Sequence, residues 1–225
     1  MRMRKKKHLE DRLADVSTLY SNLWVDTVRF DADEAPKFLD FAAIFGNDNP
    51  VHLEIGCGKG GFICELAARH PEINFLAVEV YANVLVSACE AAQERGLKNL
   101  HFLSGNAEYL DRFLPPHSIA QLYLNFSTPF PKNRQATHRL THHHFLEMYR
   151  RILAEGAHVI QKTDGRDFFQ YSLEQFSKTG YTLENISLDL HADGIEDNIV
   201  TEYERKFIEQ GLPIYRVDAT VERSV

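Results

Sequence analysis

Short apolar runs alternate with amphipathic stretches along most of the chain, from Val51 onward. The apolar runs have strand length, and the stretches between them repeat their apolar positions at helical spacing. Strands are predicted at residues 51–55, 74–80, 100–103, 119–124, 157–162, 182–188 and 213–219. This alternation predicts an α/β fold with a seven-stranded, mostly parallel sheet and helices on both faces. Because ligands of such sheets bind at the carboxyl ends of the strands, function is expected in the loops that follow them.

Four helices are predicted between the strands, each with an apolar stripe that would face the core. The stripes are Phe62, Ile63, Leu66 and Ala67; Tyr81, Val84, Leu85, Ala88 and Ala92; Phe145, Met148, Tyr149 and Ile152; and Phe169, Leu173 and Phe176. Thr141 is a predicted N-cap of the third helix.

Residues 9–50 lack this periodicity and are predicted to form an irregular N-terminal extension. Several of its apolar side chains are available to pack on the core: Leu19, Tyr20, Leu23, Trp24 and Val25. We therefore expect a single domain over residues 1–225, with an extension and basic tail at 1–50 and a Rossmann-like α/β core at 51–225.

Composition narrows the class of protein. The chain has 225 residues, of which 44% are hydrophobic and 25% charged, which is typical of a globular protein. No apolar run approaches the roughly 18 residues of a membrane span, so no membrane partner is expected. The basic start is followed by the charged stretch 8–15, which argues against a secretion signal. Three cysteines cannot form a disulfide framework, so a cytoplasmic location is expected. A monomer or a homodimer is expected in addition.

Charge is unevenly distributed. The net charge is −7, but residues 1–7 carry +5, which leaves −12 on the remainder. A second basic stretch, 130–151, has five cations and four histidines against one acid, Glu147. Focused basic segments on an acidic body can bind phosphates. The alternative is a flexible basic tail and a solvated helix face.

A glycine-rich loop follows the first predicted core strand, and its residues allow two interpretations. Gly56, Gly58 and Gly61 match the G-x-G-x-x-G pattern of nicotinamide dinucleotide sites. Gly56, Gly58 and Gly60, preceded by Glu54, also form an E-x-G-x-G-x-G pattern. A carboxylate so close to the loop would repel a pyrophosphate and favours a cofactor that carries positive charge and no phosphate. S-adenosyl-L-methionine, with its amino group and sulfonium, has this character.

Two further side chains extend this interpretation. Glu79 ends the next strand, at the spacing where an acid accepts hydrogen bonds from ribose hydroxyls. Asn106 follows the third strand, where it could contact the adenine edge or simply cap a helix. The alternative for the whole set is a tight turn with two incidental surface acids.

The loop after the fourth core strand reads Asn125-Phe-Ser-Thr-Pro-Phe-Pro-Lys132, and here the chain resembles the bacterial tRNA (guanine-N7)-methyltransferase family, which carries N-F-S-D-P-W-P-K. The resemblance covers essentially the whole chain. Further matching segments are M-R-M-R (1–4), E-I-G-x-G-K-G (54–60), A-E-Y-L (107–110), R-L-T (139–141), K-T-D (162–164), S-L-D-L-H (187–191), T-E-Y-E (201–204) and P-I-Y-R (213–216).

The resemblance implies a Rossmann-like class I methyltransferase fold. It also implies methyl transfer from S-adenosyl-L-methionine to N7 of guanosine-46 in the variable loop of tRNA. Carried over by position, the cofactor contacts are Glu54, Gly56, Gly58, Gly60, Glu79, Asn106 and Thr128. The substrate contacts are Lys132, Asp164, Thr201, Glu202, Tyr203 and Glu204, and Lys132 with Arg134 and the 1–7 tail would meet tRNA phosphates.

Three positions depart from the family pattern: Thr128 replaces an aspartate, Phe130 a tryptophan, and Gly165 an asparagine. Guanine N7 carries a lone pair and no proton, so its methylation needs positioning and no general base. A carboxylate would still stabilise the positive charge that develops on the purine, whereas Thr128 supplies no charge. We expect weakened catalysis. The alternatives are a non-catalytic tRNA- or cofactor-binding homologue, and a nicotinamide-dependent oxidoreductase that rests on the literal glycine pattern.

Other motifs have simpler interpretations. Consecutive histidines on a helix diverge by about 100° each, so His142, His143 and His144 do not predict a metal site. Cys57 in the glycine loop is expected to be accessible, and Cys64 and Cys89 to be core residues. Thr201 and Glu204 fit a helix capping box, which is compatible with a substrate role.

Overall fold

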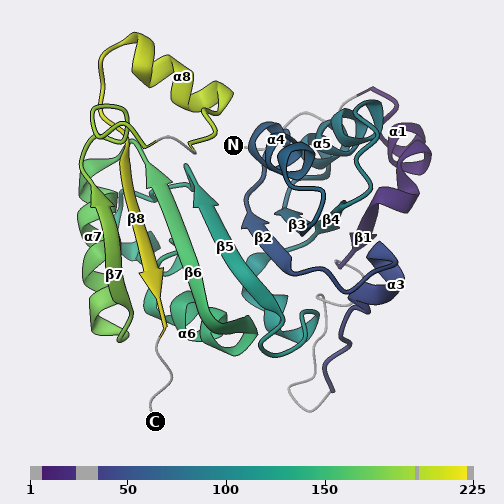
Figure 1. Ribbon diagram of the computed structural model, residues 1–225, viewed down its shortest axis with the longest axis horizontal. Coiled ribbons are helices and arrows are strands. Elements are labelled where there is room, and N and C mark those ends of the chain that lie inside the picture. The colour runs from purple at the N-terminus through teal and green to yellow at the C-terminus, as the bar shows by residue number, and fades with distance from the viewer. Residues whose placement is uncertain (1–6, 24–34, 196–197, 222–225) are drawn as a thin grey trace. The chain divides into compact units, whose positions relative to one another are not determined.

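The computed structural model of the protein describes residues 7–23, 35–195 and 198–221. The chain divides into two compact units, residues 1–115 and 116–225, each with its own set of paired strands (Figure 1). Most of the basic tail, together with Trp24 and Val25, lies outside the described residues. The prediction of a single domain stays a prediction.

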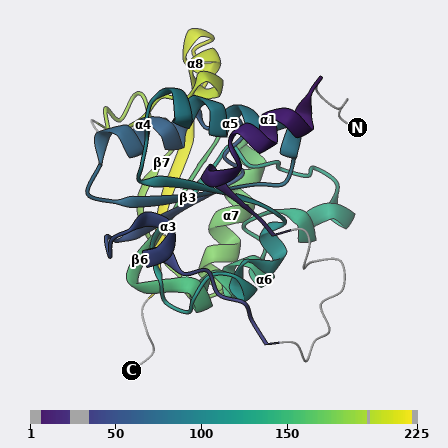
Figure 2. The same ribbon diagram turned by 90° about the vertical axis from the view of Figure 1, so that its right-hand side faces the viewer.

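The first unit contains four parallel strands in the order β1-β4-β3-β2. Their bounds are β1 Tyr20–Asn22, β2 Val51–Ile55, β3 Asn74–Glu79 and β4 Leu100–Ser104. The helices are α1 Leu9–Asp15, α3 Phe41–Phe45, α4 Gly61–Arg69 and α5 Ala82–Glu94, with 3-10 turns η1 Ser17–Leu19 and η2 Ala107–Arg112. Helices α4 and α5 pack on each other and on one face of β3 (Figure 2).

The burial of apolar side chains explains how the strands and helices of this unit pack together. Every residue of β3 and β4 is buried, as expected for parallel strands that are covered on both faces. The stripe of α4 buries Phe62, Ile63 and Ala67 as predicted. Tyr81 was wrongly included in the stripe of α5, because it precedes the helix as its N-cap and is 55% exposed.

The N-terminal extension is more regular than predicted. Residues 9–50 contain α1, α3 and the short strand β1, which pairs with β4 through Tyr20 and Phe102. Leu23 is buried beside Gly105, as the core-packing prediction requires. Three residues of strand are too few to show a period, so pairing with β4 decides this element.

The second unit contains strands in the order β5-β6-β8-β7. They are β5 Ile119–Asn125, β6 Leu153–Thr163, β7 Thr182–Ser187 and β8 Tyr215–Thr220. Strands β5 and β6 are parallel, whereas β8 is antiparallel to both β6 and β7. The described residues thus hold eight strands, four in each unit, which is one more than predicted, the addition being β1.

The helices of this unit are α6 His143–Ile152, α7 Arg166–Lys178 and α8 Glu202–Glu209, with the 3-10 turn η3 Asn133–His138. Helix α7 packs against β6, β7, β8 and α6 (Figure 1). The predicted stripe of α6 is buried in full, and α7 buries Phe169 and Phe176.

The predicted N-cap of α6 is wrong. His142 occupies that position, and Thr141 is fully buried with its hydroxyl 2.8 Å from the hydroxyl of Ser172 in α7. Because the Thr141 hydroxyl is bonded to Ser172 of α7, it does not cap α6. No pattern in the sequence predicts this contact. None of the helices in the described ranges is long and apolar enough to span a membrane.

Candidate functional site

The glycine loop joins β2 to α4 with three residues in the left-handed region. Gly56, Gly58 and Gly60 have φ values of 82°, 59° and 80°. Only glycine adopts this conformation without steric cost. The backbone N–H groups of Gly56 and Cys57 donate to the carbonyl of Val78, at 2.8 and 3.1 Å, which fixes the loop to β3.

The three glycines serve two different purposes. A Cβ at Gly60 would lie 2.9 Å from the Cβ of Ala88, so Gly60 allows α4 to pack on α5. A Cβ at Gly56 or Gly58 would meet nothing within 4 Å. These two glycines therefore leave an open backbone surface that a ligand can approach closely.

Two carboxylates stand at the carboxyl ends of β2 and β3. Glu54 is 2% exposed and Glu79 is 7% exposed. The two carboxylate oxygens of Glu79 accept the N–H of Gly58 at 3.1 Å and that of Tyr81 at 2.9 Å. Burial raises the pKa of Glu79, and these backbone N–H groups oppose that shift. Buried acids beside an open glycine backbone suit a ligand with positive charge and no phosphate, so these residues fit S-adenosyl-L-methionine.

Asn106 follows β4 and caps the 3-10 turn η2. Its side-chain oxygen accepts the N–H of Glu108 at 3.1 Å, and its amide donates to the Glu108 carboxylate at 3.0 Å. The cap that the sequence suggested is therefore present. Contact with an adenine stays a prediction.

In the second unit, the loop after β5 contains two strained residues. Phe126 and Phe130 have φ values of 50° and 41°, which are uncommon for side chains with a Cβ. Thr128 between them is exposed, as are Lys132 and Arg134. The two cations are thus accessible to an anionic partner. The ring of Phe130 lies 5.5 Å from that of His138.

Lys162 and Glu204 form a buried ion pair that joins β6 to α8. The Lys162 ammonium donates to Glu204 at 3.0 Å, to the side chain of Asn198 at 3.0 Å and to the carbonyl of Ile199 at 3.1 Å. Glu204 has no exposed surface and completes the predicted capping box with Thr201. Its carboxylate therefore holds α8 in place.

This ion pair sets the position of a second group of side chains. The ring of Tyr203, 47% exposed, lies 5.0 Å from that of Phe126 and 5.1 Å from that of Phe207. Burial raises the pKa of Tyr203, and so does the nearby negative charge of Asp164. An exposed aromatic face can stack on a purine, and a carboxylate beside it can accept hydrogen bonds from the purine's N–H groups. The side chain of Glu202 lies outside the described part of α8.

The comparisons with known proteins now decide the family. A sequence profile described as "Putative methyltransferase" matches residues 48–217. A tRNA (guanine-N(7)-)-methyltransferase from Listeria monocytogenes is 42% identical over 224 residues, covering 100% of both chains. The enzyme of that name from Bacillus subtilis is 39% identical over 97% of this chain and 98% of its own. That from Geobacillus kaustophilus is 48% identical over 78% of this chain and 81% of its own. The chain belongs to the tRNA (guanine-N(7)-)-methyltransferase family.

Solved structures support the fold of this family member. The 16S rRNA methyltransferase KamB is similar with a TM-score of 0.60 at 17% identity, over 87% of this chain and 99% of its own. A SAM-dependent methyltransferase from Aquifex aeolicus gives a TM-score of 0.55 at 13% identity, over 77% and 84%. The predicted family and Rossmann-like methyltransferase fold are confirmed. Membership in the family also removes the basis for the oxidoreductase interpretation.

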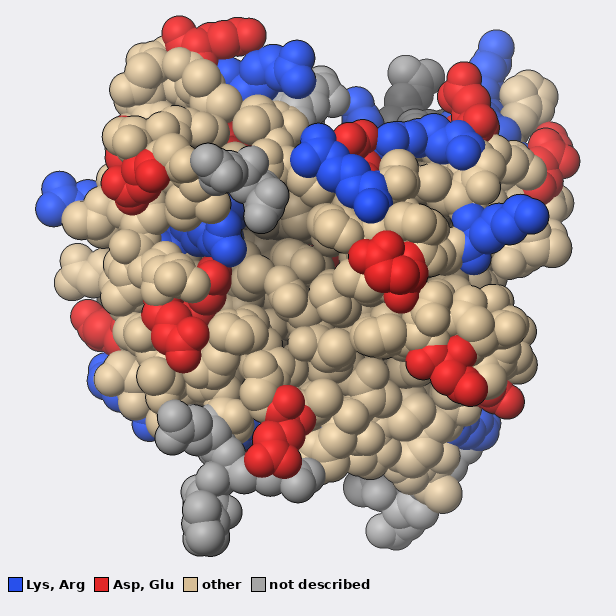
Figure 3. Space-filling model, in the orientation of Figure 1, with Lys and Arg blue, Asp and Glu red and all other residues tan. Residues whose placement is uncertain are grey.

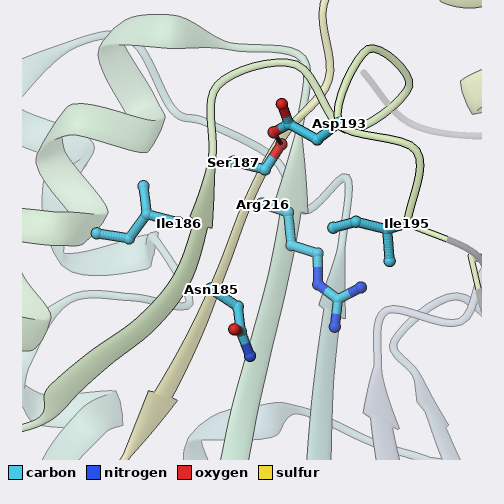
Figure 4. A pocket seen from close by; sticks show the side chains of 6 residues that line it. All are labelled: Asn185, Ile186, Ser187, Asp193, Ile195 and Arg216. Atoms are coloured by element: carbon cyan, nitrogen blue, oxygen red, sulfur yellow. Dashed lines mark hydrogen bonds between the residues drawn. The ribbon is translucent and has the colours of Figure 1, made fainter.

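A pocket of about 360 Å³ in this methyltransferase lies outside the predicted site residues (Figure 4). Two segments that carry the resemblance meet there, since Ser187 and Arg216 both line it. The Arg216 guanidinium is paired with Asp218 at 2.9 Å and 3.1 Å, and Ser187 donates to Asp193 at 2.6 Å. Periodicity alone did not predict this pocket, because a bulge in the pairing of β7 with β8 forms part of it.

Two remaining predictions concern cysteines and histidines. Cys57 is 7% exposed, so the expectation that it is accessible is wrong: the loop folds its thiol inward, and burial raises its pKa well above the usual value. Cys64 and Cys89 are buried core residues, as predicted. The Nδ1 atoms of His142 and His144 lie 2.8 Å apart, and burial, together with the neighbouring histidines, lowers the pKa of His142.

Proposed function

We propose that this protein transfers a methyl group from S-adenosyl-L-methionine to N7 of a guanosine in the variable loop of tRNA. The observation that carries the proposal is the identity of 39–48% to enzymes named for this reaction, over most of the chain. The acid-flanked glycine loop supports it independently. A tRNA-modifying enzyme whose three thiols are unpaired is also suited to the reducing cytoplasm.

The cofactor is assigned to the first unit. Glu54 and Glu79 would attract the cationic end and the ribose hydroxyls, while Gly56 and Gly58 let the ligand approach the backbone. Gly60 would act indirectly, through the packing of α4 on α5, and Asn106 would border the adenine. When bound, S-adenosyl-L-methionine supplies a methyl group on a positively charged sulfonium, which makes that group electrophilic.

The guanosine is assigned to the second unit. Tyr203 offers a face for stacking, and Asp164 can accept hydrogen bonds from the N1–H and N2–H groups of guanine. Lys132 and Arg134 are exposed cations suited to tRNA phosphates, and Arg205 and Lys206 are exposed on α8. Figure 3 shows Lys and Arg side chains on the surface over α8, at the upper left. Glu204 would contribute by holding α8, together with Thr201.

Catalysis requires alignment of N7 with the methyl group and no removal of a proton. The hydroxyl of Thr128 can accept a hydrogen bond, but it supplies no negative charge to stabilise the purine. Loss of one electrostatic group of this kind costs roughly 10²–10³ in rate in other enzymes. We therefore propose an active enzyme whose turnover is limited by this position.

The test is incubation with radiolabelled S-adenosyl-L-methionine and tRNA from a strain that lacks 7-methylguanosine, followed by nucleoside analysis. Labelled 7-methylguanosine is the expected product. Calorimetry with S-adenosylhomocysteine and with NAD accompanies it, and saturable binding of the first alone is expected. Cofactor and tRNA binding without product would instead establish the non-catalytic homologue.

A further inference from the structure

The backbone of the loop after β5 is held by a side chain that the family resemblance did not assign to the site. The Arg139 guanidinium donates from Nε to the carbonyls of Pro129 at 2.9 Å and Phe130 at 3.3 Å. Its Nη2 donates to the Phe130 carbonyl at 3.0 Å. One side chain thus ties down two consecutive peptides, directly after Thr128.

Arg139 is itself fixed from two directions. Its guanidinium carbon lies over the ring of Tyr171 in α7, 4.2 Å from the ring centroid, where the aromatic face attracts a cation. Its backbone N–H donates to Ala136 at 3.1 Å, and its carbonyl accepts from His142 at 2.9 Å. The guanidinium therefore projects from a rigid point between η3 and α6 and rests against the ring of Tyr171.

The loop needs such a support. Phe130 has a φ of 41°, a conformation that a residue with a Cβ leaves readily when nothing holds it. The bonds from Arg139 act on the carbonyl of that same residue. Thr128 lies two residues before it, so a change at Phe130 changes the direction of the backbone that carries Thr128.

We propose that Arg139 is a positioning residue of the methyl-transfer site, which fixes the Thr128–Phe130 backbone through its planar fork. This rests on the proposed function. It separates Arg139 from the other cations of the basic stretch, whose role is to meet tRNA phosphate. A fork that spans two carbonyls and stacks on an aromatic ring is a property of arginine that lysine lacks.

The decisive variant is Arg139→Lys, because it keeps the charge and removes the fork. We expect kcat for 7-methylguanosine formation to fall about 10- to 100-fold, because misplacement of reacting groups by about 1 Å has an effect of this size in other enzymes. The KM for tRNA should change less than about threefold. Arg134→Ala is the matched comparison from the same basic stretch. Because Arg134 is a cation proposed to meet tRNA phosphate, its loss is expected to act on binding: it should raise the KM for tRNA and reduce the slope of the salt dependence of binding by about one.

A second measurement reports on the loop without relying on activity. In a Trp24→Phe background, Phe130→Trp places a single tryptophan in the loop. Acrylamide quenching of its fluorescence is expected to increase when Arg139→Lys is added, while the thermal midpoint of unfolding shows that the fold is retained. If the native protein forms no 7-methylguanosine, the proposed function fails, and the quenching comparison still tests the support of the loop.

Two results would overturn the proposal. The first is an Arg139→Lys enzyme with the kcat of the native protein; if its KM for tRNA is raised at the same time, Arg139 is a phosphate contact. The second is unchanged quenching. If Arg139→Lys does not fold, Tyr171→Leu removes only the ring beneath the guanidinium, and a lower kcat with increased quenching is expected from it too.

Discussion

Individual side chains in this protein have roles that depend on whether a ligand can reach them. Thr128 and Tyr203 are exposed, whereas Glu204, from the same predicted set as Tyr203, has no accessible surface. Motif position suggested a substrate contact for both Tyr203 and Glu204, and a cofactor contact for Thr128. Burial separates them, because a carboxylate surrounded by Lys162, Asn198 and the N-terminus of α8 has no remaining direction from which a substrate can approach.

Thr128 is where a single substitution tests the electrostatics of the reaction. Thr128→Asp restores the carboxylate of the family pattern, which would stabilise the charge that develops on the purine. We expect kcat to rise, by up to roughly 10²-fold if chemistry limits turnover. Single-turnover formation of 7-methylguanosine measures this step directly. A rate that is unchanged or lower would show that a carboxylate at this position contributes nothing here.

At the scale of elements, the glycine loop shows how neighbouring strands position the backbone of the proposed cofactor site. The loop begins where β2 ends, and its backbone is fixed by Val78 and Glu79 of the neighbouring strand. The positions of the strands and of most helices could be predicted from apolar spacing. Strand β1 could not, because its three residues have no internal pattern and depend on β4 for their hydrogen bonds.

The glycines of the loop make a matched pair of variants. Gly60→Ala adds a Cβ at a φ of 80° and 2.9 Å from Ala88, so it should destabilise the fold. We expect a loss of about 2–4 kcal/mol from backbone strain and overpacking. Gly58→Ala adds a methyl group to open space, so its loss should be smaller, about 1–2 kcal/mol.

Gly58→Ala should instead weaken cofactor binding at least about tenfold, which corresponds to about 1.4 kcal/mol, because the methyl group occupies the surface that the ligand approaches. Calorimetry with S-adenosylhomocysteine and urea unfolding separate the two effects. Equal affinity in Gly58→Ala and the native protein would remove the open backbone from the cofactor site.

The attachment of α8 gives a prediction about stability. Glu204→Ala leaves the Lys162 ammonium buried without its carboxylate, which in other proteins costs about 3–5 kcal/mol. The double variant Lys162→Met with Glu204→Ala should lose less than the sum of the two single variants, since neither charge then remains. Urea unfolding of all four proteins measures the coupling. Strict additivity would mean that the pair contributes no stability of its own.

At the scale of the whole molecule, charge distribution matters more than net charge. The protein is acidic at −7, yet residues 1–7 carry +5. An anionic tRNA is attracted by such a local concentration of cations even when the total charge is negative. Whether the enzyme acts as a monomer or a homodimer stays a prediction.

Deletion of residues 1–7 tests this distribution. We expect weaker tRNA binding and a shallower dependence of the binding constant on salt, because fewer counterions are released from the nucleic acid. Affinity for S-adenosylhomocysteine should remain as in the full chain. Filter binding of tRNA at several salt concentrations measures the slope, and an unaltered slope would exclude the tail from the interface.

The sequence by itself determined the class of fold, the glycine loop with its two acids, and the family, because each of these depends on local spacing or on an ordered set of motifs. Tertiary structure alone decided which predicted contacts are accessible. Glu204 pairs with Lys162 across 42 positions, Thr141 bonds to Ser172 of α7, and Arg139 lies against Tyr171, 32 positions away. No local pattern encodes such pairs, because burial and side-chain partners arise only when distant elements pack together.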